Sequence, residues 1–242
     1  MSDYWDPRFL KHLNIKDSKV IFEVGARYGD ESIKLSKIFK EAKIYSFECN
    51  PLVIDIVKRK LEKEKNINYF SFGLGKENEK LPFYSYIKDA AGCSSLFKRI
   101  DYEETQKQTG IINIKTLNNF AQEKNINTID LLCMDVQGYE LNVLKGAKDF
   151  IKNIKFAILE EPKPIINRKY LPKNTYSKYI NAPSSKEIKK FMLENNFTEI
   201  ERIAENDIED NVMYKNNLLV KDHFEIPTPF FKKVTQFFKK NN

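Results

Sequence analysis

The sequence has no long apolar run and contains little cysteine or histidine. None of its apolar stretches approaches the roughly 18 residues of a membrane-spanning helix. Its first residues, Met1 to Arg8, lack the apolar core of a secretory signal. The 3 cysteines are scattered and odd in number, which argues against a disulfide framework or a zinc ribbon and fits a reducing compartment. We therefore expect a cytoplasmic protein.

Acidic residues are fewer than basic ones, and the formal net charge is +7. A basic balance suggests nucleic acid as the first partner to consider. The lysines, however, are spread along most predicted helices and interleaved with glutamate, and there is no arginine-rich tract. We expect a solvated lysine-rich surface and no nucleic-acid partner. An RNA-binding or RNA-modifying protein remains the alternative, and an anionic substrate would also suit the charge.

Apolar segments alternate between strand and helix patterns along most of the 242 residues. Five apolar strands are predicted between residues 19 and 159, with helices between most of them, and a late hairpin is predicted over 197–220. This order predicts a mostly parallel sheet with an antiparallel edge strand and helices on both faces. The bias toward Lys, Asn and Ile suggests an AT-rich genome and a bacterial source.

One domain is predicted over residues 19–222, with two polar loops near its site at 87–110 and 163–183. Residues 1–18 form an N-terminal lead-in whose Phe9, Leu10 and Leu13 can cover the sheet. Residues 223–242 form an amphipathic tail with phenylalanines on one helical face and lysines on much of the other. The tail either docks on the domain or on a second subunit of a homodimer, or it contacts a membrane surface.

The first predicted strand, residues 19–24, runs into two glycines, Gly25 and Gly29, before a helix begins. Glycines let a ligand approach the main chain, and the start of a helix offers free N–H groups. The spacing differs from that of dinucleotide-binding turns. Glu23 at the strand end disfavours a pyrophosphate and suits a cationic ligand such as S-adenosylmethionine. The alternative is a glycine turn that serves only packing.

The second predicted strand, residues 43–47, ends in Glu48. An acid at the end of the second strand, roughly 20 residues after the turn, is where such folds bind ribose hydroxyls. Two strand-end acids in these positions, Glu23 and Glu48, together indicate a nucleoside that carries positive charge.

A third acid, Asp135, ends a strongly apolar strand at the edge where ligands bind in open α/β sheets. It is the candidate catalytic base for an acceptor hydroxyl. Glu160 and Glu161 end the neighbouring strand, and with Asp135 they form a hypothetical all-oxygen site for Mg²⁺ or Mn²⁺. The alternative is that Glu160 or Glu161 pairs with a lysine or caps a turn.

Substrate contacts are predicted in two places. Tyr139 and Glu140 follow the turn after Asp135 and either face the substrate or simply start a helix. Ser94, Ser95, Lys98 and Arg99 lie in the first long loop, where they can close over an anionic acceptor. The role of these last four residues is a hypothesis from loop length and charge alone.

Three stretches carry a family resemblance: EVGARYGDES at 23–32, FECNP at 47–51 and IDLLCMDVQGYELNVLKGA at 129–147. They resemble the FkbM family of S-adenosylmethionine-dependent methyltransferases, and the resemblance runs from about residue 19 to 162. It implies a Rossmann-like class I methyltransferase fold with a seven-stranded sheet. It also implies transfer of a methyl group, most often to a hydroxyl of a sugar. Glu23 departs from the aspartate usual in the family but keeps its charge.

The resemblance also implies roles for single residues. Glu23, Ser32 and the main chain at Gly25 and Gly29 would hold the amino-acid end of S-adenosylmethionine. Glu48 would bind its ribose, while Cys49 and Gly73 would flank its adenine. The expected function is O-methylation of a nucleotide-linked sugar or a glycan in bacterial surface polysaccharide (capsule) biosynthesis, with a small-molecule O-methyltransferase of secondary metabolism as the alternative.

Overall fold

The structure is a computed structural model that describes residues 4–87, 92–100, 106–163 and 177–221. The predicted tail, 223–242, lies outside these residues, as do parts of both predicted loops. Within the described residues, no helix is both long and apolar enough to cross a membrane.

The elements in chain order are α1 (Pro7–Leu10), β1 (Val20–Val24), α2 (Asp30–Ile38), β2 (Lys43–Phe47), α3 (Ile54–Leu61), β3 (Ile67–Phe70), β4 (Gly73–Leu74), β5 (Glu79–Tyr86), β6 (Gln106–Lys115), α4 (Leu117–Glu123), β7 (Ile129–Met134), α5 (Glu140–Gly146), the 3-10 helix η1 (Lys148–Asn153), β8 (Ile154–Pro162), α6 (Ser185–Glu194), β9 (Phe197–Ala204) and β10 (Glu209–Asn216).

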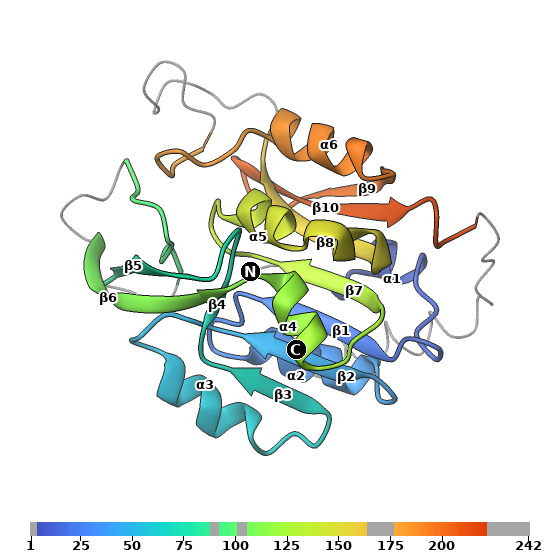
Figure 1. Ribbon diagram of the computed structural model, residues 1–242, viewed down its shortest axis with the longest axis horizontal. Coiled ribbons are helices and arrows are strands. Elements are labelled where there is room, and N and C mark those ends of the chain that lie inside the picture. Colours follow the sequence, from blue (N-terminus) through green and yellow to red (C-terminus); the bar gives the residue numbers. More distant parts are fainter. Residues whose placement is uncertain (1–3, 88–91, 101–105, 164–176, 222–242) are drawn as a thin grey trace.

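The centre of the molecule is a seven-stranded sheet in the order β3-β2-β1-β7-β8-β10-β9 (Figure 1). Strands β3, β2, β1, β7 and β8 are parallel, and β10 runs antiparallel to both of its neighbours. The predicted Rossmann-like class I sheet with a late antiparallel hairpin is therefore confirmed. Because β1 lies between β2 and β7, the chain reverses direction across the sheet at the carboxyl ends of β1 and β7. Ligands bind at such switch points in open α/β sheets.

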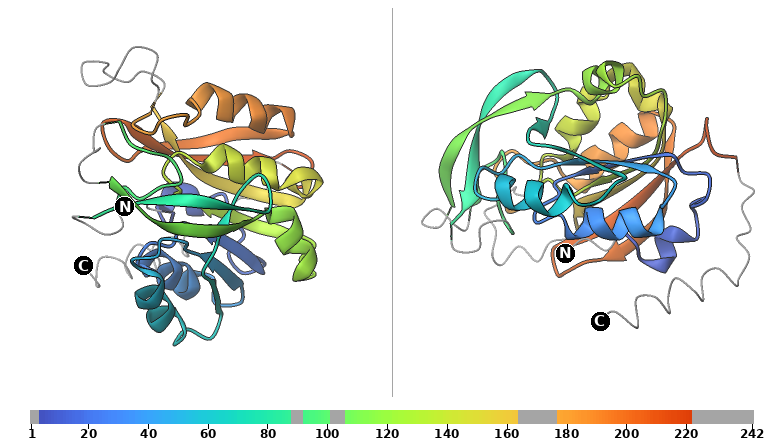
Figure 2. Two further views of the ribbon diagram at one scale, coloured as in Figure 1. Left: turned by 60° about the vertical axis from the view of Figure 1, so that its left-hand side comes forward. Right: turned by 90° about the horizontal axis from the view of Figure 1, so that it is seen from below.

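Helices cover both faces of this sheet, as predicted (Figure 2). One face packs with α4, α5 and α6 around Phe120, whose ring meets Phe47 at 4.9 Å and Phe70 at 4.8 Å between ring centroids. The other face packs with α1 and α2, and the lead-in residues Phe9 and Leu10 are buried there. Side chains that alternate along a strand therefore enter two separate cores.

A second, smaller sheet in the order β4-β6-β5 stands outside the central one (Figure 1). Strand β5 lies at one edge of this sheet and pairs with β6. The predicted loop 87–110 ends earlier than expected, because residues 106–110 begin the ten-residue strand β6. The small sheet and the segment that follows β5 supply one wall of the site described next.

Candidate functional site

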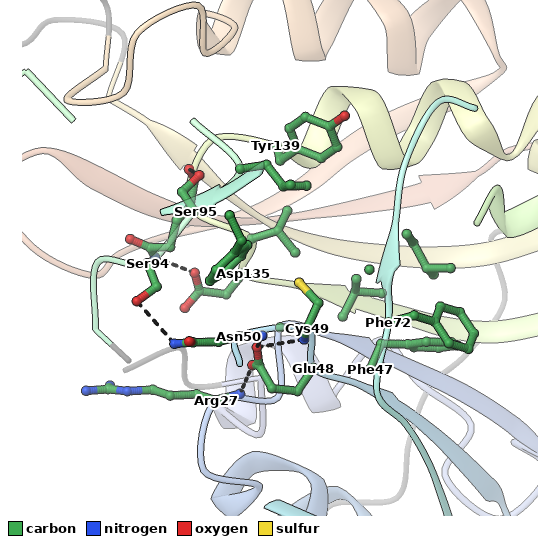
Figure 3. A pocket seen from close by; sticks show the side chains of 18 of the residues that line it. Arg27, Phe47, Glu48, Cys49, Asn50, Phe72, Ser94, Ser95, Asp135 and Tyr139 are labelled. Carbon is green, nitrogen blue, oxygen red and sulfur yellow. Dashed lines mark hydrogen bonds between the residues drawn. The ribbon is translucent and has the colours of Figure 1, made fainter. Parts of the chain in front are cut away.

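A cavity lies at the switch point of the central sheet and encloses about 710 Å³, part of it open to solvent (Figure 3). Its floor is formed by the carboxyl ends of β1, β2 and β7. Its walls are formed by residues 72–74 and by the segment 92–96, which crosses above the strand ends. The cavity thus brings together the carboxyl ends of β1, β2 and β7, three of the four strands whose terminal acids were singled out from the sequence.

Gly25 fits the floor only because it has no side chain. Its φ is +93°, and a Cβ built on it would lie 1.9 Å from the carbonyl oxygen of Asp135. The amide of Asp135 also donates to the carbonyl of Val24 over 3.1 Å. The main chains at the ends of β1 and β7 are therefore in direct contact, and the predicted need for glycine here has a specific cause.

Glu48 lines the cavity and is held by three main-chain N–H groups. Its Oε2 accepts from Arg27 over 2.6 Å, and its Oε1 accepts from Cys49 over 2.8 Å and from Asn50 over 2.7 Å. Burial raises the pKa of this carboxyl, and the three N–H donors act against that rise. Glu48 follows the end of β2, as predicted, and the three hydrogen bonds fix its side chain in one orientation.

An apolar slot continues from Glu48 along the wall of the cavity. Phe47 and Phe72 make an edge-to-face contact, with ring centroids 5.7 Å apart and 64° between the ring planes. Gly73 also lines the slot, where an added Cβ would lie 3.4 Å from the Cys49 sulfur and 2.7 Å from Ile114. A slot of this composition suits a flat, uncharged ring.

The structure places three predicted cofactor residues beneath the β1–α2 turn instead of in the cavity. Glu23 is fully buried and accepts hydrogen bonds from the hydroxyls of Ser32 and Ser46. Burial raises the pKa of Glu23 to about 8. Gly29 precedes α2 with a φ of +78° and packs on Leu61 of α3. Glu23, Gly29 and Ser32 therefore support the turn and do not line the cavity.

Gln137 connects Asp135 to Glu160 at the carboxyl ends of β7 and β8. Its Nε2 donates to Asp135 Oδ1 over 2.5 Å and to Glu160 Oε2 over 2.9 Å, and its Oε1 accepts from the hydroxyl of Tyr179. Its φ of +55° is unusual for a side chain of this size. Burial, together with the charges of Asp135 and Glu209, raises the pKa of Glu160 well above its ordinary value.

The predicted metal site of Asp135, Glu160 and Glu161 is wrong, because the Glu161 side chain points away from the other two. Successive residues of a strand point to opposite faces, and Glu161 lies on the face away from Asp135. There it accepts from the hydroxyls of Ser185 and Tyr214, each over 2.6 Å, and from Arg202 over 3.2 Å. In the part of the chain that the structure describes, no group of three or more His, Cys, Asp or Glu side chains could hold a metal ion.

Of the predicted substrate residues, Tyr139, Ser94 and Ser95 line the cavity. The Tyr139 ring meets Phe97 with centroids 5.1 Å apart, and the Ser95 hydroxyl donates to the main-chain oxygen of Gln137 over 2.8 Å. Glu140 is buried and accepts from the main-chain N–H groups of Val136 and Gly138. Its role at the start of α5 matches the second of the two predicted alternatives.

Lys98 and Arg99 do not line the cavity. The ammonium of Lys98 lies over the ring of Tyr84, 5.4 Å from its centroid. Arg99 is buried, and its guanidinium lies 5.4 Å from the centroid of the Tyr179 ring. Neither side chain is therefore positioned to bind an anion inside the cavity.

Sequence reasoning did not select Asn50 or Gln137 as site residues. Asn50 Nδ2 donates to Ser94 Oγ over 3.2 Å. Its Oδ1 accepts from Ser85 over 2.8 Å and from the main-chain N–H of Leu52 over 3.1 Å, in the turn before α3 begins at Ile54. The signal that could have found Asn50 and Gln137 is their place inside the most family-like stretches.

Known proteins resemble this chain over much of its length. The model of the methyltransferase FkbM domain family matches residues 23–199. Methyltransferase sdnD of Sordaria araneosa is 27% identical over 164 residues, which cover 56% of this chain and 63% of the relative. The 2-O-methyltransferase NoeI of Sinorhizobium fredii is 22% identical over 155 residues, which cover 60% of this chain and 64% of the relative. The chain thus spans less than two thirds of either relative.

Among solved structures, an S-adenosylmethionine-dependent methyltransferase from Aquifex aeolicus aligns with a TM-score of 0.47 and 14% identity, covering 87% of this chain and 94% of that protein.

Proposed function

The chain belongs to the FkbM family of methyltransferases, and from this premise we propose that it is an S-adenosylmethionine-dependent O-methyltransferase acting on a hydroxyl of a sugar. The relative NoeI is a 2-O-methyltransferase, which supports oxygen as the acceptor atom. The proposed setting is bacterial surface polysaccharide biosynthesis in the cytoplasm, with the sugar either nucleotide-linked or part of a glycan.

The residues at the cavity fit S-adenosylmethionine. Glu48 Oε2 accepts one main-chain hydrogen bond and retains capacity to accept another from a ribose hydroxyl. The adenine ring would lie against the apolar wall that Phe47, Phe72 and Leu74 give the cavity. The main chain at Gly25 can be approached closely, since no Cβ fills the space beside Asp135.

The amino-acid end of the cofactor would lie near Asp135 and Arg27, which line the cavity near the end of β1. Glu31, in the first turn of α2, has one buried carboxylate oxygen with no hydrogen-bond donor. Asp135 is close enough for its charge to contribute to the raised pKa of Glu31, an effect that comes mainly from burial. An ammonium group would satisfy both carboxylates, and the guanidinium of Arg27 would pair with a carboxylate.

The chemistry depends on alignment and on removal of one proton. When bound, S-adenosylmethionine supplies a methyl group on an electrophilic sulfonium. Alignment of the acceptor oxygen can contribute roughly 7–11 kcal/mol. Asp135 would accept the proton that the acceptor hydroxyl loses, and Gln137 would hold Asp135 in the orientation required, through its 2.5 Å hydrogen bond to Oδ1.

One observation carries this proposal: Glu48, the apolar slot and Asp135 line a single continuous cavity at the switch point of the sheet. Isothermal titration calorimetry with S-adenosylhomocysteine tests it, with Glu48→Gln as the variant. We expect micromolar binding that falls about tenfold in Glu48→Gln, because charged hydrogen bonds contribute about 1.5–3 kcal/mol each. The matched control is Glu62→Gln, just beyond α3 and outside the cavity.

Two results would refute the proposal. The first is absence of any heat of binding with S-adenosylhomocysteine. The second is equal weakening of binding in Glu48→Gln and Glu62→Gln, which would place the nucleoside elsewhere.

A further inference from the structure

Four polar residues beyond the cavity form a group at the carboxyl end of β8 and the adjoining end of the β9–β10 hairpin. We call Glu160, Glu205, Glu209 and Asn211 the acidic cluster. Asn211 lies directly across from Glu160 in the antiparallel pairing of β10 with β8, so the two side chains share one face of the sheet. Asn211 Nδ2 donates to Glu205 Oε2 over 2.7 Å, and the amide of Glu205 donates to the carbonyl of Glu209 over 3.2 Å.

One atom in the acidic cluster needs a donor that the described residues do not supply. The side-chain oxygen Oδ1 of Asn211 is buried and has no hydrogen-bond partner among the described residues, and the whole residue is only 3% exposed. A buried amide oxygen without a donor costs about 1–3 kcal/mol. Such an atom is expected to be satisfied by a ligand or an ordered water. Because an amide oxygen only accepts hydrogen bonds, the ligand that satisfies Asn211 Oδ1 must donate one.

The acidic cluster is joined to the cavity through Gln137. Gln137 lines the cavity, and its Nε2 donates to both Asp135 and Glu160. Its left-handed φ of +55° holds the amide between the two carboxylates. Strained main-chain conformations of this kind concentrate at functional sites. A molecule that extends from Asp135 toward β8 would therefore meet Glu160 and Asn211 next.

Among the residues that the structure describes, the charges around the acidic cluster are mostly negative. Asp135, Glu209 and Glu205 are each close enough to contribute to the raised pKa of Glu160, after burial as the main cause. Lys178 is the cation whose charge reaches Glu209. The cations expected to bind an anionic acceptor, Lys98 and Arg99, lie instead over the rings of Tyr84 and Tyr179. A phosphate near the cluster would be repelled, whereas hydroxyl and ammonium groups would be bound.

We propose that the acidic cluster, together with Gln137, is the acceptor subsite, and that it binds a hydroxyl-rich saccharide with no negative charge near the methylated hydroxyl. A neutral glycan or an amino sugar fits this description, and a nucleotide-linked sugar does not. This inference rests on the proposed function and narrows its substrate class. The proposed subsite is acidic, although the chain as a whole has a formal net charge of +7.

The test compares matched ligands on the complex with S-adenosylhomocysteine. Methyl glycosides of neutral and amino sugars are compared with the same sugars as uridine diphosphate conjugates, by saturation-transfer NMR. The variant is Glu205→Gln with Glu209→Gln, which removes two charges while leaving an oxygen for Asn211 Nδ2. The control is Glu201→Gln, on the same hairpin but paired with Lys11 away from the cluster.

We expect at least one methyl glycoside to bind more tightly than its uridine diphosphate conjugate. In the double variant, affinity for amino glycosides should fall about fivefold or more, and the difference from the conjugates should shrink. The control should leave both unchanged.

The inference is overturned if the conjugates bind more tightly than every glycoside. It is also overturned if no glycoside binds, or if the double variant behaves like Glu201→Gln. Failure of the proposed function gives a different result, because S-adenosylhomocysteine itself would then not bind.

Discussion

The two ends of the site are built in different ways. At the end that contains Glu48 and Gly25, which we call the donor end, the contacts are made by main-chain groups of residues close in the sequence, such as the amides of Arg27, Cys49 and Asn50. At the end that contains Gln137 and the acidic cluster, which we call the acceptor end, the contacts join side chains from distant segments. Main-chain contacts follow from strand order and tolerate varied side chains, whereas side-chain contacts can differ between relatives. The comparison therefore assigns cofactor binding to the fold and substrate choice to this particular chain.

The largest effect is expected at Gly25, on which the donor end depends. Gly25→Ala forces a Cβ against the Asp135 carbonyl at 1.9 Å and imposes a φ of +93° on a residue with a side chain. We expect the free energy of unfolding to fall by about 3 kcal/mol or more, with loss of S-adenosylhomocysteine binding. Urea denaturation and calorimetry measure the two effects.

Gly110→Ala is the matched control for Gly25→Ala, because its added Cβ would lie 3.3 Å from Pro51 and its φ is not positive. It should change the free energy of unfolding by less than about 1 kcal/mol. Equal damage from both variants would show that the Gly25 contact has no special role.

An intermediate effect is expected at Gln137 and should be confined to the acceptor end. Gln137→Gly keeps a residue that accepts φ of +55° but removes the hydrogen bonds to Asp135, Glu160 and Tyr179. We expect kcat to fall about 30-fold, which corresponds to about 2 kcal/mol. The affinity for S-adenosylhomocysteine should change less than about threefold.

Gln137→Asn is a second variant that tolerates the left-handed conformation but is too short to span both carboxylates, and it should behave like Gln137→Gly. If either variant weakened S-adenosylhomocysteine as strongly as it lowered kcat, the division into two ends would be wrong.

The smallest effect on S-adenosylhomocysteine binding is expected at Glu23, which lies beneath the donor end and does not line the cavity. Its pKa is raised to about 8 in the folded protein from an ordinary value of 4.5. The folded state therefore holds a proton that the unfolded state has lost, and stability falls as the pH rises from about 4.5 to about 8. Glu23→Gln does not titrate, so the dependence should flatten by about 1 kcal/mol per pH unit within that window.

Urea denaturation at pH 5.5, 6.5 and 7.5 measures this slope, and the affinity for S-adenosylhomocysteine should not change. The control is Glu187→Gln, because the pKa of Glu187 is lowered by the main-chain N–H of Ser184. Glu187 is then charged in both states throughout the range, and its removal should leave the slope as it was. An unchanged slope in Glu23→Gln would show that Glu23 ionises normally.

The central sheet and the donor end could be predicted because their signals are local. The apolar run Val20–Val24 and its following glycine specify a strand and a tight turn, and Glu48 ends the next strand in the same way. The roles of Glu160 and Glu161 could not be separated, since adjacent residues enter opposite cores and only the pairing of β8 decides which faces Asp135. For a similar reason, the sequence did not show that the Glu23 side chain points to Ser32 and Ser46 and does not line the cavity.

The acceptor end could not be predicted because its contacts join segments far apart in the chain. The hydroxyl of Tyr179 reaches Gln137 across more than forty positions, from a segment without regular structure. The left-handed conformation of Gln137 leaves no mark in its residue type, since glutamine is not a turn former.

The segment above the cavity is fastened on two sides. Ser94 is tied to Asn50 beside the ribose position, Ser95 is tied to Gln137 beside the acceptor, and the main chains of Ser95 and Tyr84 pair as in a strand. In the proposed function, S-adenosylhomocysteine would leave through this side only after some of these hydrogen bonds open. Release of this product would then limit kcat, and removal of the Ser94 hydroxyl, which bonds Asn50 and not Gln137, would raise kcat.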